Sequence, residues 1–397
     1  MASFDPAAAT AAYLAELSPA AHAKATAYTQ GGHWLLLWGW LVTVVVCVLI
    51  ARSRVLEKAK AGLERGKPRP LLVSFVLSVI FMVLDWILEL PWDSYADWWR
   101  EGQYGLTSQP WIGAVADSAI VFAVQLPVIG LFFVALYALV RHAPRTWPLW
   151  TGLVVGAFIL FGAWAQPAVI EPLVNHYTAA PPGPVRDLVV SMGKAYGVPT
   201  DKIYVYNGSK QSNRYTANVA GLFGTARVAL SDTMFAKGAD LAEVRGVVGH
   251  EMGHYVLHHV VWGTLFSAVM AALAALGVLW LFPVVRGWLG ADGVTGLTDP
   301  AGLPIVYLIF ATLSLLATPI LNTETRFFES AADSFSLEHA NEPDGLAKAL
   351  VKTIEYRASS PSDLEEFIFY DHPSVEHRVR KAMDWKVTHP PRAAGAP

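Results

Sequence analysis

The sequence predicts a mostly α fold, namely a multispanning helical membrane protein with a small α+β domain built from two polar segments. Hydrophobic residues make up 54% of the 397 positions and charged residues only 15%, against about 25% charged in an average soluble domain. The apolar residues gather into runs of about 18 or more, long enough for a helix to cross the hydrocarbon core of a bilayer. The net charge of −3 offers no basic surface for a polyphosphate backbone, so no nucleic acid partner is expected.

Six apolar runs predict six membrane spans. They cover residues 34–52, 70–91, 112–141, 147–169, 256–283 and 302–321. The third run contains Pro127, so we expect a tilted, kinked or protruding helix there. The segment before the first span has no basic stretch followed by an apolar one, so we expect no cleavable signal peptide. The single Cys47 excludes an internal disulfide framework and a Cys-rich zinc cluster.

The remaining residues form the two polar segments. In the first, a Pro/Gly turn (AAPPGP) precedes a predicted helix (VRDLVVSMGKAYG) and predicted strands in KIYVYN, ANVAGLF and ARVALSD. The second contains the predicted helices TRFFESAADSFSLEHA and PDGLAKALVKTIEYRA. The predicted organisation is a polar tail (1–33), four spans (34–169), the first polar segment (170–255), two spans (256–321), the second polar segment (322–385) and a disordered tail (386–397).

The number of spans places both polar segments on one side of the membrane, because four spans precede the first segment and two separate it from the second. The loop 51–70 holds seven Lys/Arg and two Glu. The positive-inside rule places this loop in the cytoplasm and the polar segments outside. The alternative is a solvated basic helix whose bias is overridden by later spans.

The first polar segment ends in VVGHEMGHYVLHH, which contains His250-Glu251-x-x-His254. Two His four residues apart lie on one face of a helix and can both bind a metal, while the Glu can act as a general base toward water. The alternative is a pair of helix histidines packed near the membrane surface. Of His258 and His259, only His258 shares the metal face, and we expect both to line the site without binding the metal.

A catalytic zinc needs a third protein ligand, and LNTETRFFESAAD supplies candidates. Asn322, Arg326, Glu329 and Asp333 follow at helical spacing and line one stripe. Glu329 can then reach the metal, while Asp333 accepts a hydrogen bond from a ligating His. The alternative is a solvated charged face with an Arg326–Glu329 pair.

Four segments in this order, GSKQSNRYTAN, GHEMGHY, NTETRFFESAAD and DHPSVEHR, resemble the type I CAAX prenyl proteases. These are integral-membrane zinc endopeptidases of the gluzincin type, and the resemblance extends from about residue 70 to 385. It implies that the two polar segments build a zinc-peptidase domain with one Zn²⁺ per chain. It further implies His250, His254 and Glu329 as zinc ligands, Glu251 as the base, and Asp333 as the partner of a ligand.

The resemblance also assigns residues that would contact the substrate. His372 and Arg378 match a His-Pro segment with Arg six residues after the His, which implies binding of the substrate carbonyl and the developing oxyanion. The family usually has Asn-Ala-aromatic in the strand that pairs with the substrate, whereas this chain has Thr216-Ala217-Asn218. Strand pairing depends mainly on main-chain groups, so we expect these residues to bind the peptide.

Two further features of the family differ from this chain. Eukaryotic members are described with seven spans against the six predicted here, and the match is weakest before residue 70. The family also places its zinc site toward the cytosol, opposite to the side predicted by the basic loop.

The resulting prediction is a membrane zinc endopeptidase that cuts membrane-associated or prenylated, CAAX-type peptide or protein substrates. Its partner is the lipid bilayer, that of the cell membrane if bacterial or of the endoplasmic reticulum if eukaryotic. One alternative is a non-enzymatic zinc-containing receptor, transporter or scaffold, against which the presence of Glu251 argues. Another is cleavage within transmembrane helices, but Glu329 follows the last span, which favours cleavage of an extended segment near the interface.

Overall fold

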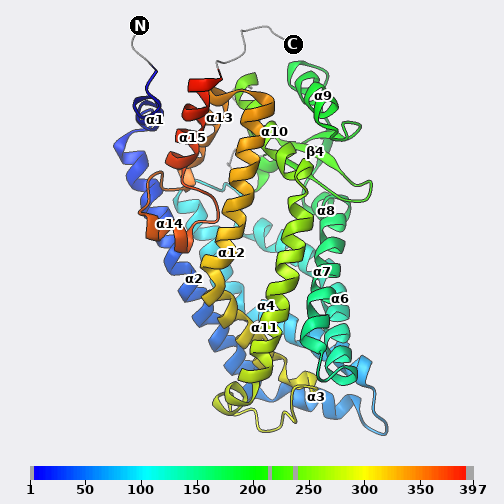
Figure 1. Cartoon of the computed structure of the whole chain (residues 1–397). Coiled ribbons are helices and arrows are strands. Elements are labelled where there is room, and N and C mark those ends of the chain that lie inside the picture. The colour runs from blue at the N-terminus through cyan, green and yellow to red at the C-terminus, as the bar shows by residue number, and fades with distance from the viewer. Residues whose placement is uncertain (1–3, 213–216, 236–239, 390–397) are drawn as a thin grey trace.

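The computed structural model describes residues 4–212, 217–235 and 240–389. Six helices in it are long and apolar enough to cross a membrane, as predicted. They are α2 (Pro19–Ser53), α4 (Pro70–Asp93), α6 (Trp111–His142), α7 (Trp147–Ala165), α11 (His259–Leu289) and α12 (Leu303–Ala340). They run along the long axis of the molecule (Figure 1).

The surface of these helices is that of a membrane protein. Large apolar side chains such as Trp280, Leu153 and Leu316 are more than 60% exposed on them, and lipid is the solvent that such residues match. Proline lies in the first turn of α2, α4 and α12, where its missing N–H costs no hydrogen bond. Pro127 lies inside α6, which continues through it as one helix.

The end of the bundle opposite to the polar segments is closed by α3 (Val55–Leu63), which lies within the predicted basic loop (Figure 1). Lys60 of α3 pairs with Asp299 at 2.8 Å, which ties this loop to the connection between α11 and α12. Short helical segments extend two of the spans at the other end. They are a π-helical turn (Ser94–Trp99) and α5 (Arg100–Gln103) after α4, and a π-helical turn (Gln166–Ile170) and α8 (Glu171–Val174) after α7.

The first polar segment is an α+β unit, as predicted. A four-stranded sheet has the order β1-β2-β4-β3, with β2 and β4 parallel and the outer pairs antiparallel. The elements are β1 (Tyr177–Ala179), α9 (Pro184–Tyr196), β2 (Ile203–Tyr206), β3 (Ala217–Ala220), β4 (Arg227–Ser231) and α10 (Leu241–Val256). Their shared core contains Val189, Met192, Val228, Leu230, Val248 and Met252. The strand β1 was not predicted.

The second polar segment begins inside α12, because the last span and the helix with the polar stripe form one element of 38 residues. It continues with α13 (Pro343–Lys352), α14 (Asp363–Phe369) and α15 (Val375–Thr388). Residues 386–388, assigned by the prediction to a disordered tail, belong to α15, and residues 390–397 lie outside the described part of the chain.

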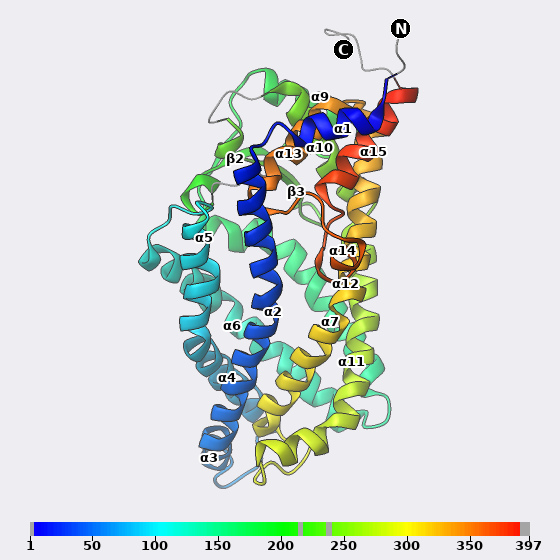
Figure 2. The same cartoon turned by 90° about the vertical axis from the view of Figure 1, so that its left-hand side faces the viewer.

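The N-terminal region, predicted as a polar tail, contains α1 (Pro6–Leu14) and the first turns of α2. Asp5 caps α1 by accepting from the amide of Ala7 at 2.8 Å. The helix packs on α15 and α13 (Figure 2), and the Tyr13 hydroxyl donates to Asp344 at 2.7 Å. The helix α1 is therefore packed as part of the same unit as the C-terminal helices.

Candidate metal centre

The histidines of the HExxH sequence lie on α10, one turn apart on the same face. Asp240 begins this helix by accepting from the amide of Ala242 at 2.9 Å, a standard N-cap. The Nε2 atoms of His250 and His254 are 3.1 Å apart. Both rings therefore present a nitrogen lone pair to the same small space.

Glu329 of α12 closes this space from the other polar segment. One carboxylate oxygen lies 3.3 Å from Nε2 of His250 and the other 3.3 Å from Nε2 of His254. The three residues together offer ligand atoms within 4.8 Å of one another. Oε2 of Glu329 is buried and, among the described residues, has no hydrogen-bond partner. Two imidazoles and one carboxylate form a common catalytic zinc set, so the residues present fit a zinc ion.

The close packing of α10 on α12 makes this meeting possible. A Cβ atom at Gly253 would come within 3.2 Å of Cα of Ala332, tighter than an ordinary contact, so glycine favours the close approach of the two helices at this point. Two turns earlier on α10, the carbonyl oxygen of Gly246 accepts from the Ser336 hydroxyl at 2.8 Å. These contacts fix Glu329 opposite the two histidines.

Asp333 and Arg378 lie on the side of His250 that faces away from Nε2. Nδ1 of His250 contacts Oδ1 of Asp333 at 2.9 Å, and Nε and Nη2 of Arg378 donate to the two oxygens of Asp333 at 2.8 and 2.7 Å. The Asp333 geometry agrees with the sequence expectation. Arg378, which the resemblance assigns to the oxyanion, forms a buried bidentate pair with Asp333, and its Nη2 also lies 3.6 Å from Oε2 of Glu329.

Two further groups border the candidate metal site. Glu251 follows His250 on α10, and burial raises the pKa of its carboxyl. His372, in the turn between α14 and α15, places Nε2 3.3 Å from Oε1 of Glu329. Its Nδ1 lies 2.8 Å from Asp371, and burial lowers the pKa of its imidazole. The turn that carries His372 is thus a third part of the chain, after α10 and α12, that contributes a side chain beside the candidate ligands His250, His254 and Glu329.

Asn322 and Arg326 share the stripe of Glu329, but in the described part of the chain their side chains donate to α14 and the residue that follows it. Nη1 of Arg326 donates to the carbonyl oxygens of Glu366 (2.9 Å) and Tyr370. Nδ2 of Asn322 donates to the carbonyl oxygen of Ile368 at 2.9 Å. These acceptors lie at and just beyond the carboxyl end of α14, where a helix leaves carbonyl oxygens available to donors from outside it. The stripe therefore anchors the segment that precedes His372.

The predicted substrate-binding residues fall at an edge of the sheet. Ala217 and Asn218 begin β3, which pairs with β4 on one side and is the outermost strand of the sheet. β3 also packs against α10, the helix of the HExxH sequence. Thr216 lies outside the described residues.

His259, and not His258 as expected, lies on the side of the candidate ligands. His258 is exposed, whereas His259 is buried, with its Nδ1 2.9 Å from Nδ1 of His254. The expectation assumed one continuous helix. The chain instead turns between α10 and α11, where His258 has a φ of 56°.

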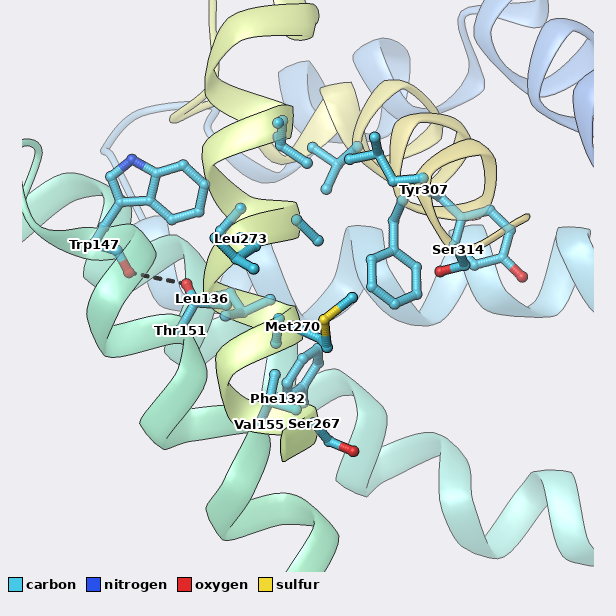
Figure 3. A pocket seen from close by; sticks show the side chains of 18 of the residues that line it. Phe132, Leu136, Trp147, Thr151, Val155, Ser267, Met270, Leu273, Tyr307 and Ser314 are labelled. Carbon is cyan, nitrogen blue, oxygen red and sulfur yellow. Dashed lines mark hydrogen bonds between the residues drawn. The ribbon is translucent and has the colours of Figure 1, made fainter. Parts of the chain in front are cut away.

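An apolar pocket lies between the spans α6, α7, α11 and α12 (Figure 3). Its volume is about 690 Å³. Lining side chains include Phe132, Trp147, Met270, Leu273, Tyr307 and Leu321. Leu321 precedes Glu329 by eight residues on α12, which corresponds to about 12 Å along a helix axis.

Comparisons with known proteins match both the membrane part and the polar part of the chain. The model of peptidase family M48 matches residues 181–386, and the model described as CAAX prenyl protease N-terminal, five membrane helices, matches residues 7–176. Four helices that could span a membrane lie within the described part of the latter range, one fewer than the five named by that model.

Two curated relatives illustrate the similarity. The chain is 28% identical over 382 residues to the uncharacterized metalloprotease YhfN of Bacillus subtilis (strain 168), covering 92% of this chain and 86% of the relative. It is 29% identical over 331 residues to CAAX prenyl protease 1 of Saccharomyces cerevisiae, covering 76% of this chain and 70% of the relative. The crystal structure of Ste24p from S. mikatae has the same fold, with a TM-score of 0.71 at 20% identity over 93% of this chain and 90% of that chain.

A six-span helical bundle joined to a domain with a His-His-Glu group on packed helices defines an integral-membrane metallopeptidase. The family match is equally direct, since it covers more than half of the sequence. The chain belongs to peptidase family M48, whose members depend on zinc.

Proposed function

We propose that this protein is a membrane zinc endopeptidase that holds one zinc ion per chain through His250, His254 and Glu329 and cleaves prenylated, CAAX-type substrates. The observation that carries this proposal is the convergence of three ligand atoms within 4.8 Å beside Glu251. Structural zinc sites are closed by four protein ligands, whereas catalytic sites keep a position open. A three-ligand group with an adjacent carboxylate is the arrangement that hydrolysis requires.

The chemistry divides between the ion and the chain. When bound, zinc supplies Lewis-acid activation of the scissile carbonyl and of the attacking water. Glu251 accepts the proton of this water and delivers it to the leaving amine. Because burial raises the pKa of Glu251, its carboxylate is a stronger base than a solvated one.

His372 is the residue that we assign to the developing oxyanion. Its Nδ1 faces the Asp371 carboxylate, and its Nε2 lies 3.3 Å from Oε1 of Glu329. Because Nδ1 carries the proton that faces Asp371, Nε2 donates to the oxyanion in the imidazolium form, which the Asp371 carboxylate favours. Arg378 supports the same reaction indirectly, since its bidentate pair with Asp333 holds the partner of His250.

The position of β3 at the edge of the sheet supports binding of an extended peptide as an added strand. One side of β3 pairs with β4, and the strand is the last of the sheet. A peptide added to the other side would gain main-chain hydrogen bonds next to α10 without needing particular side chains. We assign this role to Ala217 and Asn218, together with Thr216.

The CAAX specificity rests on two observations. Two curated relatives, matched over 72% and 70% of their length, carry the names CAAX prenyl protease 1 homolog and CAAX prenyl protease 1. The apolar pocket between the spans ends about 12 Å along α12 from Glu329, so an isoprenoid attached near the scissile bond could reach apolar surroundings.

The test is cleavage of a farnesylated CAAX peptide and its unprenylated twin by detergent-purified protein. We expect cleavage of the farnesylated peptide at the higher kcat/KM, loss of activity on removing zinc with a chelator, and recovery on adding zinc back. Equal cleavage of both peptides would keep the endopeptidase and remove the lipid requirement. Zinc binding without cleavage of either peptide would contradict the proposal.

A further inference from the structure

The turn between α10 and α11 brings a residue outside the HExxH sequence against one of the candidate ligands. On a continuous helix, residue i+5 points about 140° away from residue i, so His259 would face away from His254. The left-handed conformation of His258 (φ 56°, ψ 38°) ends α10 and redirects the chain. The first residue of α11, His259, then lies with Nδ1 2.9 Å from Nδ1 of His254.

The backbone conformation that produces this contact is an unusual one. A residue other than glycine with positive φ is sterically disfavoured, and such outliers persist where the surrounding structure requires them. The side chain of His258 is exposed, so packing of this side chain does not account for the left-handed conformation. The feature that the turn places in the interior is the ring of His259, which is 8% exposed.

Packing holds this ring in a defined orientation. It stacks on Phe328 of α12, with ring centroids 4.5 Å apart and planes at 17°. Phe328 in turn approaches α11 at Gly263, where an added Cβ would lie 3.5 Å from its ring and 3.3 Å from Glu324. The residue next to Glu329 therefore fixes the imidazole of His259.

The direction of the hydrogen bond follows from the other nitrogen of His254. Nε2 of His254 faces Nε2 of His250 and Oε1 of Glu329, so this atom must offer its lone pair if a metal is bound there. A neutral imidazole carries its proton on the other nitrogen, so Nδ1 of His254 is an N–H donor. The acceptor within reach is the lone pair on Nδ1 of His259.

We propose that His259 is a positioning residue that accepts the Nδ1–H of His254 and so fixes the tautomer and ring orientation in which Nε2 binds the metal. This inference rests on the proposed zinc site. It makes the two ligand histidines unequal, because His250 has an anionic partner in Asp333 and His254 a neutral one. An anionic partner raises the basicity of a ligand, so His259 orients its ligand without adding a further negative charge to the site.

The test measures zinc affinity by competition with a chromophoric chelator, using full-length protein stripped of metal in detergent. The main comparison is His259→Asn against His259→Leu. The two replacements have the same shape, but the amide oxygen of asparagine can accept a hydrogen bond near the position of Nδ1, and leucine cannot. His258→Asn is the matched control, since asparagine tolerates the left-handed conformation and the side chain is exposed.

We expect His259→Leu to weaken zinc binding by about 10–100-fold, the usual cost of losing the partner of a ligand histidine. His259→Asn and His258→Asn should stay close to the wild-type affinity. The melting temperatures of the metal-free asparagine and leucine variants should agree, which separates the effect from folding. If the leucine variant does not fold, His259→Phe replaces it, because a phenyl ring can still stack on Phe328.

Two results would overturn the inference while leaving the zinc site intact. Equal weakening by asparagine and leucine would assign His259 to packing, and unchanged affinity in both variants would remove it from the site. A wild-type protein that binds no zinc would contradict the proposed function itself.

Discussion

At the scale of single residues, the sequence alone does not separate two roles for Arg378, namely binding of the oxyanion and support of the candidate zinc ligand His250 through Asp333. Its guanidinium donates to both oxygens of Asp333, behind His250, so we propose that Arg378 acts through zinc binding. Arg378→Lys keeps the positive charge but loses the planar fork. We predict zinc affinity about tenfold weaker, within the range for losing an outer partner, measured by chelator competition.

The control for this change is Arg380→Lys. Arg380 lies on the same helix but is exposed, where it pairs with Asp384, and its replacement should leave zinc affinity unchanged. If Arg378→Lys instead kept the zinc affinity and lost kcat by about 10² or more, the residue would contact the oxyanion in the transition state.

The residues that are easiest to identify from the sequence are those spaced along a single helix. His250, Glu251 and His254 are set by helical spacing, and Glu329 and Asp333 follow from the same periodicity on a second helix. The partner of Arg378 could not be read in this way, because Asp333 lies 45 residues away in the sequence. The position of His259 depends on the left-handed turn at His258, for which no glycine or asparagine gives a sequence signal.

At the scale of elements, α12 links the membrane to the candidate site. Asn322 and Arg326, on the membrane side of Glu329, bind carbonyl oxygens at the carboxyl end of α14, and His372 follows that end by three residues. A cation near a helix carboxyl end is also favoured by the helix dipole. The same helix therefore carries Glu329 and holds the segment that presents His372.

Removal of this anchor should affect turnover more than metal binding. Arg326→Met keeps the length of the side chain and loses the donors to α14. We predict unchanged zinc content and a loss of kcat of about 10–100-fold, since a displacement near 1 Å of a positioned group costs about this much. Zinc content by mass spectrometry and peptide hydrolysis on the same samples measure both. Arg380→Met is the control, and a parallel loss of zinc would show that the anchor supports the ligands instead.

The elements that the sequence predicted correctly are those with a long and uniform pattern. Six apolar runs gave six spans, and the strands around 203–206, 217–220 and 227–231 appeared where expected. β1 was missed because three residues carry no periodicity. The continuity of α12 was missed because its pattern changes from apolar to striped while the helix does not end. The signal for α1 was present in Asp5 followed by Pro6, a cap and first-turn pair.

At the scale of the whole molecule, the candidate metal site lies at one end of the bundle and the apolar pocket between the spans (Figures 1 and 3). The number of spans predicted that both polar segments lie on the same side of the membrane. This agrees with the structure, because the two segments meet at His250 and Glu329. The polar end would bind the peptide at the interface and the pocket would take an apolar chain. Binding energy from such a remote group can support the reaction at the site.

Filling the pocket should therefore discriminate between lipidated and plain substrates. Ala274 lines the pocket on α11, and Ala274→Phe would occupy part of its volume. We predict a KM for the farnesylated peptide raised by about tenfold, a cost near 1.4 kcal/mol, with no change for the unprenylated peptide. Leu276→Phe, two residues along the same helix and exposed, is the control. An equal change in both KM values would mean that the pocket does not take the isoprenoid.

The central claim is that α10 and α12 together build a hydrolytic zinc site, and the most direct measurement is zinc content and peptide hydrolysis on the same preparations of wild-type protein and Glu251→Gln. We predict one zinc per chain in both proteins. We expect hydrolysis by wild type and a loss of about 10²-fold or more in the variant, because only the general base has been removed. Near-wild-type turnover by Glu251→Gln, or an absence of zinc from the active wild-type protein, would contradict this claim.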